Sequence, residues 1–495
     1  MPIVREKHIS TKQNMLWNAA GSLFFLGCLW LITVLVVRLS NGYDAAGVLA
    51  LGMAVSNIGV PLAQYKIRAY QVSDIEHEFS PGLYVGHRFV TMALAFVIMV
   101  VYGSLTCAAE TLPAVLLYCL YSLVAVFSDV FQGIEQQHDR MDIVGISYFL
   151  RGAATLGGFV ISMLLTGSLV VSFIAMTVLC VLCVVLYELP CVRFLEPHFS
   201  LSFDKTQLAR LFTICLPAVI ASLFASAIPS IPRQILGAVA GTAVLGGYAS
   251  IAAPVLIIQM GATYVYAPLL KNIAELSASG NTRGFTGLLL KAALAMLGIA
   301  VAASLVLIFA ASPLFTLLYG EGVTEYLVFL YPLILCTVLT ALSWFLGDVL
   351  IAIRDLRGNL IAFAVAFALS AVLAYPLICF AGGNGVSFAI SLGMACAVVI
   401  ALARIFAHCK NAEHAATHAS AACREDREPL GSTSSHAGNA QTDEARINEK
   451  VHAKTEVVQT EDVQTEVVQT EAAQAKVVQT EEVQAKKVQA KEVHS

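Results

Sequence analysis

Long apolar stretches of about 20 residues alternate with short polar connections from Leu16 to about Phe406. A stretch of this length crosses the hydrocarbon core of a bilayer as one helix. The pattern predicts twelve membrane-spanning helices, over residues 15–37, 45–65, 88–107, 112–133, 143–166, 169–189, 209–231, 243–269, 286–310, 325–350, 359–380 and 386–407. The connections are too short for an extramembrane catalytic domain, so an enzyme is not expected.

Basic residues separate the two sides of this predicted membrane domain. If the N-terminus lies inside, the inner connections receive lysines and arginines along the whole chain, whereas the outer side receives only Arg38 and Arg233. This asymmetry predicts that both termini are cytoplasmic and that the protein is a multi-pass protein of the cell membrane. A mean hydropathy of +0.78, with 13% charged residues, excludes an ordinary soluble globule. No nucleic-acid partner, cofactor or metal is expected.

The two halves of the apolar region resemble each other. Residues 38–74 and 245–266 both contain a short outer turn followed by an apolar span that ends in polar residues, and 118–140 resembles 331–354. Six spans return the chain to the same side, so we expect two parallel six-helix lobes, residues 1–203 and 204–410, with a binding site between them. From 411 to 495 the composition becomes polar, with a five-residue repeat after Lys454. This pattern predicts a disordered tail; a docking arm for a cytoplasmic partner is the alternative.

A polar stripe marks the end of the second span. If the helix continues, Asn57, Pro61, Gln64 and Arg68 fall on one face, at i, i+4, i+7 and i+11. Polar atoms on one side of an apolar helix are expected to line a wet cavity. Arg68 and Arg88 flank a short turn, and each offers a bidentate contact to a phosphate. The alternative is that these arginines are only juxtamembrane anchors, which leaves Asn57 and Gln64 unexplained.

Similar stripes occur in other spans. In the fourth span one face contains Tyr118, Ser122, Ala125, Asp129, Gln132 and Gln136, and in the first span Asn14, Asn18 and Ser22 are four residues apart. Arg151 lies about 12 Å inside the fifth span, too deep to reach water easily. Asp129 and Arg151 are therefore either a static ion pair or a protonatable switch beside an arginine that binds an anion. Asp348 is a second candidate for the switch. Glu188, His138 and Asp139 are expected to be solvated near the inner interface.

Several of these motifs together resemble a known family. The opening Asn14–Trp17, the segments Arg68–Asp74 and Arg88–Thr91, and the pattern Gly133, Gln136, Arg140–Asp142, Ser147 and Arg151–Gly152 are similar to Wzx-type polysaccharide biosynthesis flippases. These flippases belong to the multidrug/oligosaccharidyl-lipid/polysaccharide exporter superfamily, and the resemblance covers residues 1 to about 407. It implies an all-helical membrane protein with two lobes in a V, alternating access, and undecaprenyl-pyrophosphate-linked oligosaccharide as cargo. Membrane lipid and polysaccharide assembly proteins are implied partners, and coupling to H⁺ or Na⁺ is common in the superfamily.

The resemblance suggests a role for each polar group. The pyrophosphate would be drawn into an inward-open cavity by Arg68, Arg88 and Arg151. Hydrogen bonds to sugar hydroxyls would come from Asn18, Asn57, Gln64, Asp129, Gln132 and Gln136. Arg38 and Arg233 would receive the headgroup at the outer side, and Asp129 or Asp348 would couple transport to an ion.

Three other classes of function remain open on the sequence alone. A drug/cation antiporter of the same fold would prefer acidic residues in its cavity. A membrane-embedded polysaccharide polymerase or glycosyltransferase would need catalytic groups on a sizeable outer loop, which the pattern does not predict. A pore or scaffold without turnover would not require the duplicated lobes.

Overall fold

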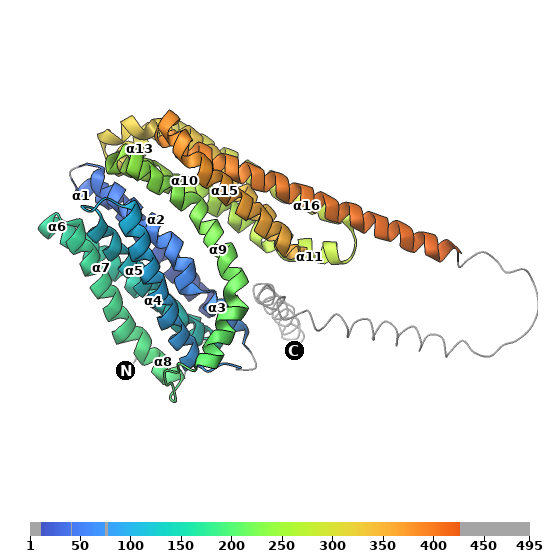
Figure 1. The fold of residues 1–495 in the computed structure, drawn as a ribbon, viewed down its shortest axis with the longest axis horizontal. Coiled ribbons are helices and arrows are strands. Elements are labelled where there is room, and N and C mark those ends of the chain that lie inside the picture. The colour runs from blue at the N-terminus through green and yellow to red at the C-terminus, as the bar shows by residue number, and fades with distance from the viewer. Residues whose placement is uncertain (1–10, 41, 75–77, 426–495) are drawn as a thin grey trace, which may run out of the picture.

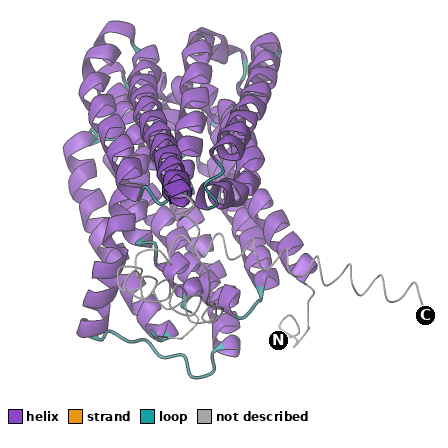
Figure 2. Cartoon of the chain, turned by 90° about the vertical axis from the view of Figure 1, so that its right-hand side faces the viewer, coloured by secondary structure: helices purple, strands orange, loops and turns teal. Residues whose placement is uncertain are grey.

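The computed structural model of the chain describes residues 11–40, 42–74 and 78–425 (Figures 1 and 2). Within these ranges the secondary structure is helical, without strands. The elements are α1 (Thr11–Leu39), α2 (Asp44–Gln64), α3 (Ile67–Ser73), α4 (Pro81–Thr106), α5 (Leu112–Gln137), α6 (Met141–Thr166), α7 (Leu169–Cys183), the π-helix η1 (Val184–Glu188), α8 (Leu189–Leu195), α9 (Lys205–Ala240), α10 (Thr242–Tyr266), η2 (Ala267–Leu269), α11 (Leu270–Ala278), α12 (Thr282–Phe309), α13 (Ala311–Tyr319), η3 (Glu321–Phe329), α14 (Leu330–Ala352), α15 (Leu356–Ala381) and α16 (Gly383–Glu425). Twelve described helical segments are long and apolar enough to cross a membrane, which confirms the predicted number of spans.

The helices form two bundles that meet at one end. In Figure 1 the N-terminal bundle (α1–α8) and the C-terminal bundle (α10–α16) lie close together near α1, α10 and α13 and diverge toward α8 and α11. This is the V shape that the family resemblance implied. α9 runs between the bundles and packs on both α2 and α15. It contains Pro217, Pro229 and Pro232, and each proline removes a helical hydrogen bond, which allows a long helix to bend.

The buried apolar side chains follow the same division. The largest cluster combines residues of both bundles, such as Val55 of α2 with Tyr248 and Val255 of α10. Two further clusters lie apart from it: one joins α3–α5 to the first half of α9, and the other lies within the C-terminal bundle. The bundles therefore share one core where they converge and have separate cores where they diverge.

The polar stripe of the second span is not continuous, contrary to the prediction. α2 ends at Gln64, because Tyr65 and Lys66 adopt left-handed φ angles of 49° and 54° before α3 begins. A non-glycine residue in this conformation needs support from its surroundings. The Tyr65 ring is buried against Phe212 of α9, and its hydroxyl donates to the Phe212 carbonyl at 3.2 Å. The break therefore separates α3 from α2.

The C-terminal helix is longer than expected. α16 continues through Glu425, so residues 411–425 are helical although they fall in the segment predicted to be disordered. The remainder of the predicted tail, residues 426–495, lies outside the described residues.

Candidate binding site in the N-terminal bundle

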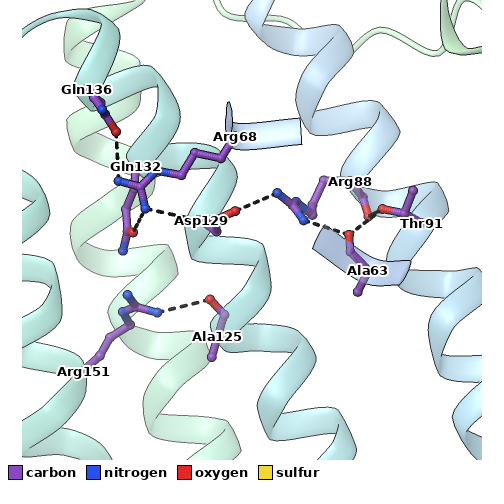
Figure 3. Close-up of polar contacts among 9 residues, drawn as sticks. All are labelled: Ala63, Arg68, Arg88, Thr91, Ala125, Asp129, Gln132, Gln136 and Arg151. Carbon is purple, nitrogen blue, oxygen red and sulfur yellow. Dashed lines mark hydrogen bonds and ion pairs between the residues drawn. The ribbon is translucent and has the colours of Figure 1, made fainter. Parts of the chain in front are cut away.

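Arg68 is the centre of a polar cluster between α3 and α5. Its Nη1 donates to Asp129 Oδ1 at 3.2 Å and to Gln132 Oε1 at 3.0 Å, and its Nη2 donates to Gln136 Oε1 at 3.0 Å (Figure 3). The predicted polar face of the fourth span therefore presents three of its members to a single guanidinium. The break after Gln64 is what makes this possible, because it places Arg68 on a separate short helix that packs on α5.

Arg88 approaches Asp129 from the other side. Its Nη2 lies 2.9 Å from Asp129 Oδ2, and its Nη1 donates to the carbonyl of Ala63 at 2.8 Å. Thr91 Oγ1 donates to the same carbonyl at 2.8 Å. The last carbonyls of a helix have no partner within the helix. Because α2 ends one residue later, Arg88 and Thr91 satisfy the Ala63 carbonyl and fix the end of α2.

The members of this cluster differ in exposure and together carry an excess of positive charge. The side chains of Arg68 and Asp129 are 23% and 22% exposed, whereas Arg88 is fully buried. Two guanidinium groups face one carboxylate, so the hydrogen-bonded cluster has a net charge of +1. Only Arg68 offers that charge to a molecule outside the bundle. The arrangement is suited to binding an anionic group at Arg68, with Arg88 holding Asp129 in place.

Arg151 belongs to a second cluster, so the proposed ion pair between Asp129 and Arg151 is wrong. Its Nε lies 3.5 Å from Glu188 Oε1, its Nη1 donates to the Ala125 carbonyl at 3.3 Å, and its guanidinium carbon lies 5.2 Å from the centre of the Tyr148 ring. The Arg151 side chain is 3% exposed. It is therefore a buried group within the bundle, and Figure 3 shows it separate from the contacts of Arg68.

Glu188 is fully buried, which contradicts the expectation that it is solvated. It ends the π-helix η1, and its carboxylate accepts a hydrogen bond from Ser147 in addition to the contact with Arg151. A π-helical turn shifts the register of the residues that follow, and such turns are frequent at functional sites. His138 and Asp139 are exposed, as expected.

The remaining candidates of the N-terminal bundle lie away from the described contacts of Arg68. Asn57 and Gln64 are exposed on α2, and Asn18 is half-buried on α1. The structure therefore brings Gln132 and Gln136 to the cluster, while a direct role for the three others stays a prediction.

The candidates of the C-terminal bundle form no equivalent cluster among the described residues. Asp348 accepts a hydrogen bond from the Tyr266 hydroxyl at 2.9 Å. Arg233 is half-buried on α9 and lies near Tyr248 and Cys336.

Arg38 joins the two bundles at the end where they converge. It donates from α1 to the carbonyls of Leu318 at 2.8 Å and Thr316 at 3.0 Å, and to that of Leu317, at the C-terminal end of α13. Cations are favoured at this end of a helix.

Other contacts extend this junction along α2, α10 and η3. Thr242 Oγ1 donates to Asp44 Oδ1 at 2.6 Å, and the rings of Tyr43 and Tyr326 lie 4.8 Å apart. We call these contacts and those of Arg38 the outer junction, because they lie on the predicted outer side.

Sequence reasoning missed one further buried acid. Glu135, on the last turn of α5, is fully buried, and neither of its carboxylate oxygens has a hydrogen-bond partner among the described residues. Its position beside Gln136 is a signal that was available. Glu135 lies three residues after Gln132, so the predicted polar face of this helix extends to it.

Comparison with known proteins gives a result for the fold alone. No protein-family model and no curated protein matches the chain. Among solved structures, the chain is similar to the lipid II flippase MurJ in an inward closed conformation, with a TM-score of 0.61 and 10% identity over 84% of this chain and 94% of that chain. 

A multidrug resistance MATE family transporter of the MOP superfamily in an inward-facing conformation gives a TM-score of 0.58 and 14% identity, over 79% of this chain and 98% of that chain. A multidrug resistance MATE family transporter in an outward-facing conformation gives a TM-score of 0.54 and 14% identity, over 82% of this chain and 98% of that chain.

These likenesses show which class of fold the chain has. Its fold is similar to that of MATE transporters and of MurJ, as the family resemblance implied, and the described residues of this chain contain twelve helices long enough to span a membrane. The neighbours include both a lipid flippase and multidrug transporters, so the fold is compatible with either kind of cargo.

Proposed function

We propose that the protein is a flippase that moves a lipid-linked oligosaccharide with an anionic, pyrophosphate-type headgroup between the leaflets of the cell membrane by alternating access. The observation that carries the proposal is the net charge of +1 on the partly exposed cluster of Arg68, Arg88 and Asp129. A cationic drug would be repelled by this excess charge, whereas a phosphate would be attracted. The similarity in fold to a protein named a lipid II flippase supports the proposal.

In this proposal Arg68 makes the direct contact with the headgroup. A phosphate oxygen replaces the carboxamide oxygen of the half-buried Gln136, which now accepts a hydrogen bond from Arg68, and the released amide turns to sugar hydroxyls. Gln132 is buried and keeps its hydrogen bond from Arg68. Arg88 is fully buried and keeps Asp129 oriented, so its role is positioning. Arg151 stabilises the bundle through Glu188 and does not touch the cargo.

The expected loss on removal of Arg68 follows from these contacts. A charge-assisted hydrogen bond contributes about 1.5–3 kcal/mol. Arg68→Ala should therefore weaken headgroup binding by about tenfold to a hundredfold. Arg68→Lys keeps the charge but not the forked geometry and should be intermediate.

The test measures binding and transport of an undecaprenyl-pyrophosphate-linked sugar by purified protein in lipid vesicles. Arg193→Ala is the matched control, because Arg193 is an exposed arginine of the same bundle, on α8. Weaker binding by the folded Arg68→Ala variant, with the control unchanged, supports the proposal. Unchanged binding by that variant, or uptake of a cationic dye by wild-type vesicles that bind no lipid-linked sugar, would refute it and favour a drug/cation antiporter.

A further inference from the structure

Glu135 is a buried acid that the proposed binding of the headgroup does not use. It lies on the last turn of α5, its side chain has no solvent exposure, and both carboxylate oxygens lack hydrogen-bond partners among the described residues. An ionised carboxylate in such a place has lost its hydration without gaining a replacement, which is costly. A neutral carboxyl group loses much less hydration free energy on burial.

The charged and titratable groups that face Glu135 come from several helices. Glu188, Arg151, Arg68 and Asp142 lie within electrostatic range, and so do the Tyr187 hydroxyl of η1 and the Cys191 thiol of α8. Most of these charges are already balanced. Arg151 is paired with Glu188, and Arg140 binds both oxygens of Asp142, at 2.8 and 2.9 Å.

Arg68 is the nearby cation whose charge is not balanced. With Arg88 and Asp129 it forms the cluster of net charge +1. If Glu135 is ionised, the net charge of this cluster together with Glu135 is zero. If Glu135 carries a proton, the excess positive charge beside the partly exposed Arg68 is restored. The protonation state of Glu135 therefore sets how strongly the cluster attracts an anion.

We propose that Glu135 binds a proton in the conformation described and that this proton raises the affinity of Arg68 for the anionic headgroup. The proton bonds to one carboxylate oxygen of Glu135 and returns to water when the surroundings of α5 open. The proton site rests on the surroundings of Glu135 alone, whereas its link to the headgroup rests on the proposed function. A proton requires one oxygen, whereas a metal cation requires several oxygen ligands.

Linkage gives the size of the effect. If protonation strengthens headgroup binding by a given factor, headgroup binding strengthens proton binding by the same factor. Coupling of this kind is typically 5- to 150-fold, so we expect headgroup affinity to fall about tenfold or more when the pH rises enough to remove the proton. In Glu135→Gln, which keeps the shape of the neutral acid, affinity should stay high and independent of pH in that range.

The first measurement tests the proton site without any cargo. Infrared difference spectra of the purified full-length protein in lipid, recorded during a pH titration, should contain the carbonyl band of a buried protonated carboxyl group. The band should be absent in Glu135→Gln and shifted in Glu135→Asp, and unchanged in Glu110→Gln, an exposed acid between α4 and α5. A band that persists in Glu135→Gln overturns the assignment, and so does a spectrum that responds to Na⁺ rather than to pH.

The second measurement tests the link to the headgroup. Binding of an undecaprenyl-pyrophosphate-linked sugar is measured against pH for the wild type, Glu135→Gln and Glu110→Gln. Loss of the pH dependence in Glu135→Gln alone supports the coupling. If the wild type binds the lipid equally well at every pH while the infrared band titrates, the coupling is overturned. If it binds no such lipid, the proposed function fails, and the infrared result still decides the proton site.

Discussion

Replacing Arg38 with glutamine is expected to weaken the outer junction and shift the protein toward a state that is open on the predicted outer side. Arg38 donates three hydrogen bonds from α1 to carbonyls at the end of α13, and so connects the two bundles. Glutamine cannot reproduce the three-way contact, and it removes the cation from the negative end of the helix.

The magnitude follows from the number and exposure of these contacts. Arg38 is exposed, so each hydrogen bond is taken at the low end of its range, about 0.5 kcal/mol. The charge at the end of α13 contributes a similar amount. The loss of Arg38 should therefore cost the closed junction about 2 kcal/mol, which changes the ratio of closed to open molecules by about thirtyfold. Arg38→Lys keeps the charge and should have a smaller effect.

The assay is the distance distribution between spin labels at Thr166 and Phe380, two exposed positions at the same end of the two bundles. The labels are placed on cysteines in a variant without the native cysteines. In Arg38→Gln a population with longer distances should appear, whereas Arg283→Gln, at an exposed arginine near the start of α12, should match the starting protein. Identical distributions in the two variants would refute the assignment of Arg38 to closure of the junction.

Two further predictions concern packing and pH. A Cβ atom at Gly47 would overlap the carbonyl oxygen of Thr242, so Gly47→Leu should lengthen the distance between the spin labels at Thr166 and Phe380. Gly27 has open space around it, so Gly27→Leu should leave that distance unchanged. Equal distances in the two variants would contradict this prediction. The hydrogen bonds from Arg404, at 2.7 Å, hold the pKa of Asp355 below its ordinary value of 3.8. Because this pKa is lower in the folded state, the ionised carboxylate stabilises the fold at any pH above 3.8. That stabilisation is lost as the pH falls through the pKa of the folded state. Asp355→Asn should therefore melt at a lower temperature than the wild type at neutral pH, and the gap should close below about pH 4; a gap that persists in acid would contradict the assignment.

The sequence was sufficient to predict features that depend on one helix at a time. The number of spans follows from the length of the apolar stretches, because a membrane imposes that length on each helix. The face of α5 that carries Asp129, Gln132 and Gln136 follows from the helical period. The structure confirms the count of spans and shows that these three side chains meet one partner, Arg68.

Features that depend on contacts between helices could not be predicted in the same way. The break at Tyr65 is stabilised by Phe212, which is 147 positions away in the chain, so the local sequence gives no warning of it. The partner of Arg151 could not be predicted for a similar reason. Glu188 lies near the end of an apolar stretch, where a charged residue usually reaches water, but in the fold it is buried and contacts Ser147 and Arg151 of α6.

The strengths of the Arg68 contact and of the outer junction together decide whether ligand binding can change the conformation of the protein. In the proposed function a contact between Arg68 and a phosphate would contribute about 1.5–3 kcal/mol, and the loss of Arg38 from the outer junction is expected to cost about 2 kcal/mol. A ligand shifts a conformational equilibrium only by the difference in its affinity for the two states. Because the two amounts are similar, binding at Arg68 is able to open the outer junction if part of that contact forms only in the outward-open state. A junction much stronger than the substrate contact would hold the bundles in one state, and a much weaker one would leave the site open to both sides. The modest strength of the Arg38 contacts is therefore what alternating access would require of them under the proposed function.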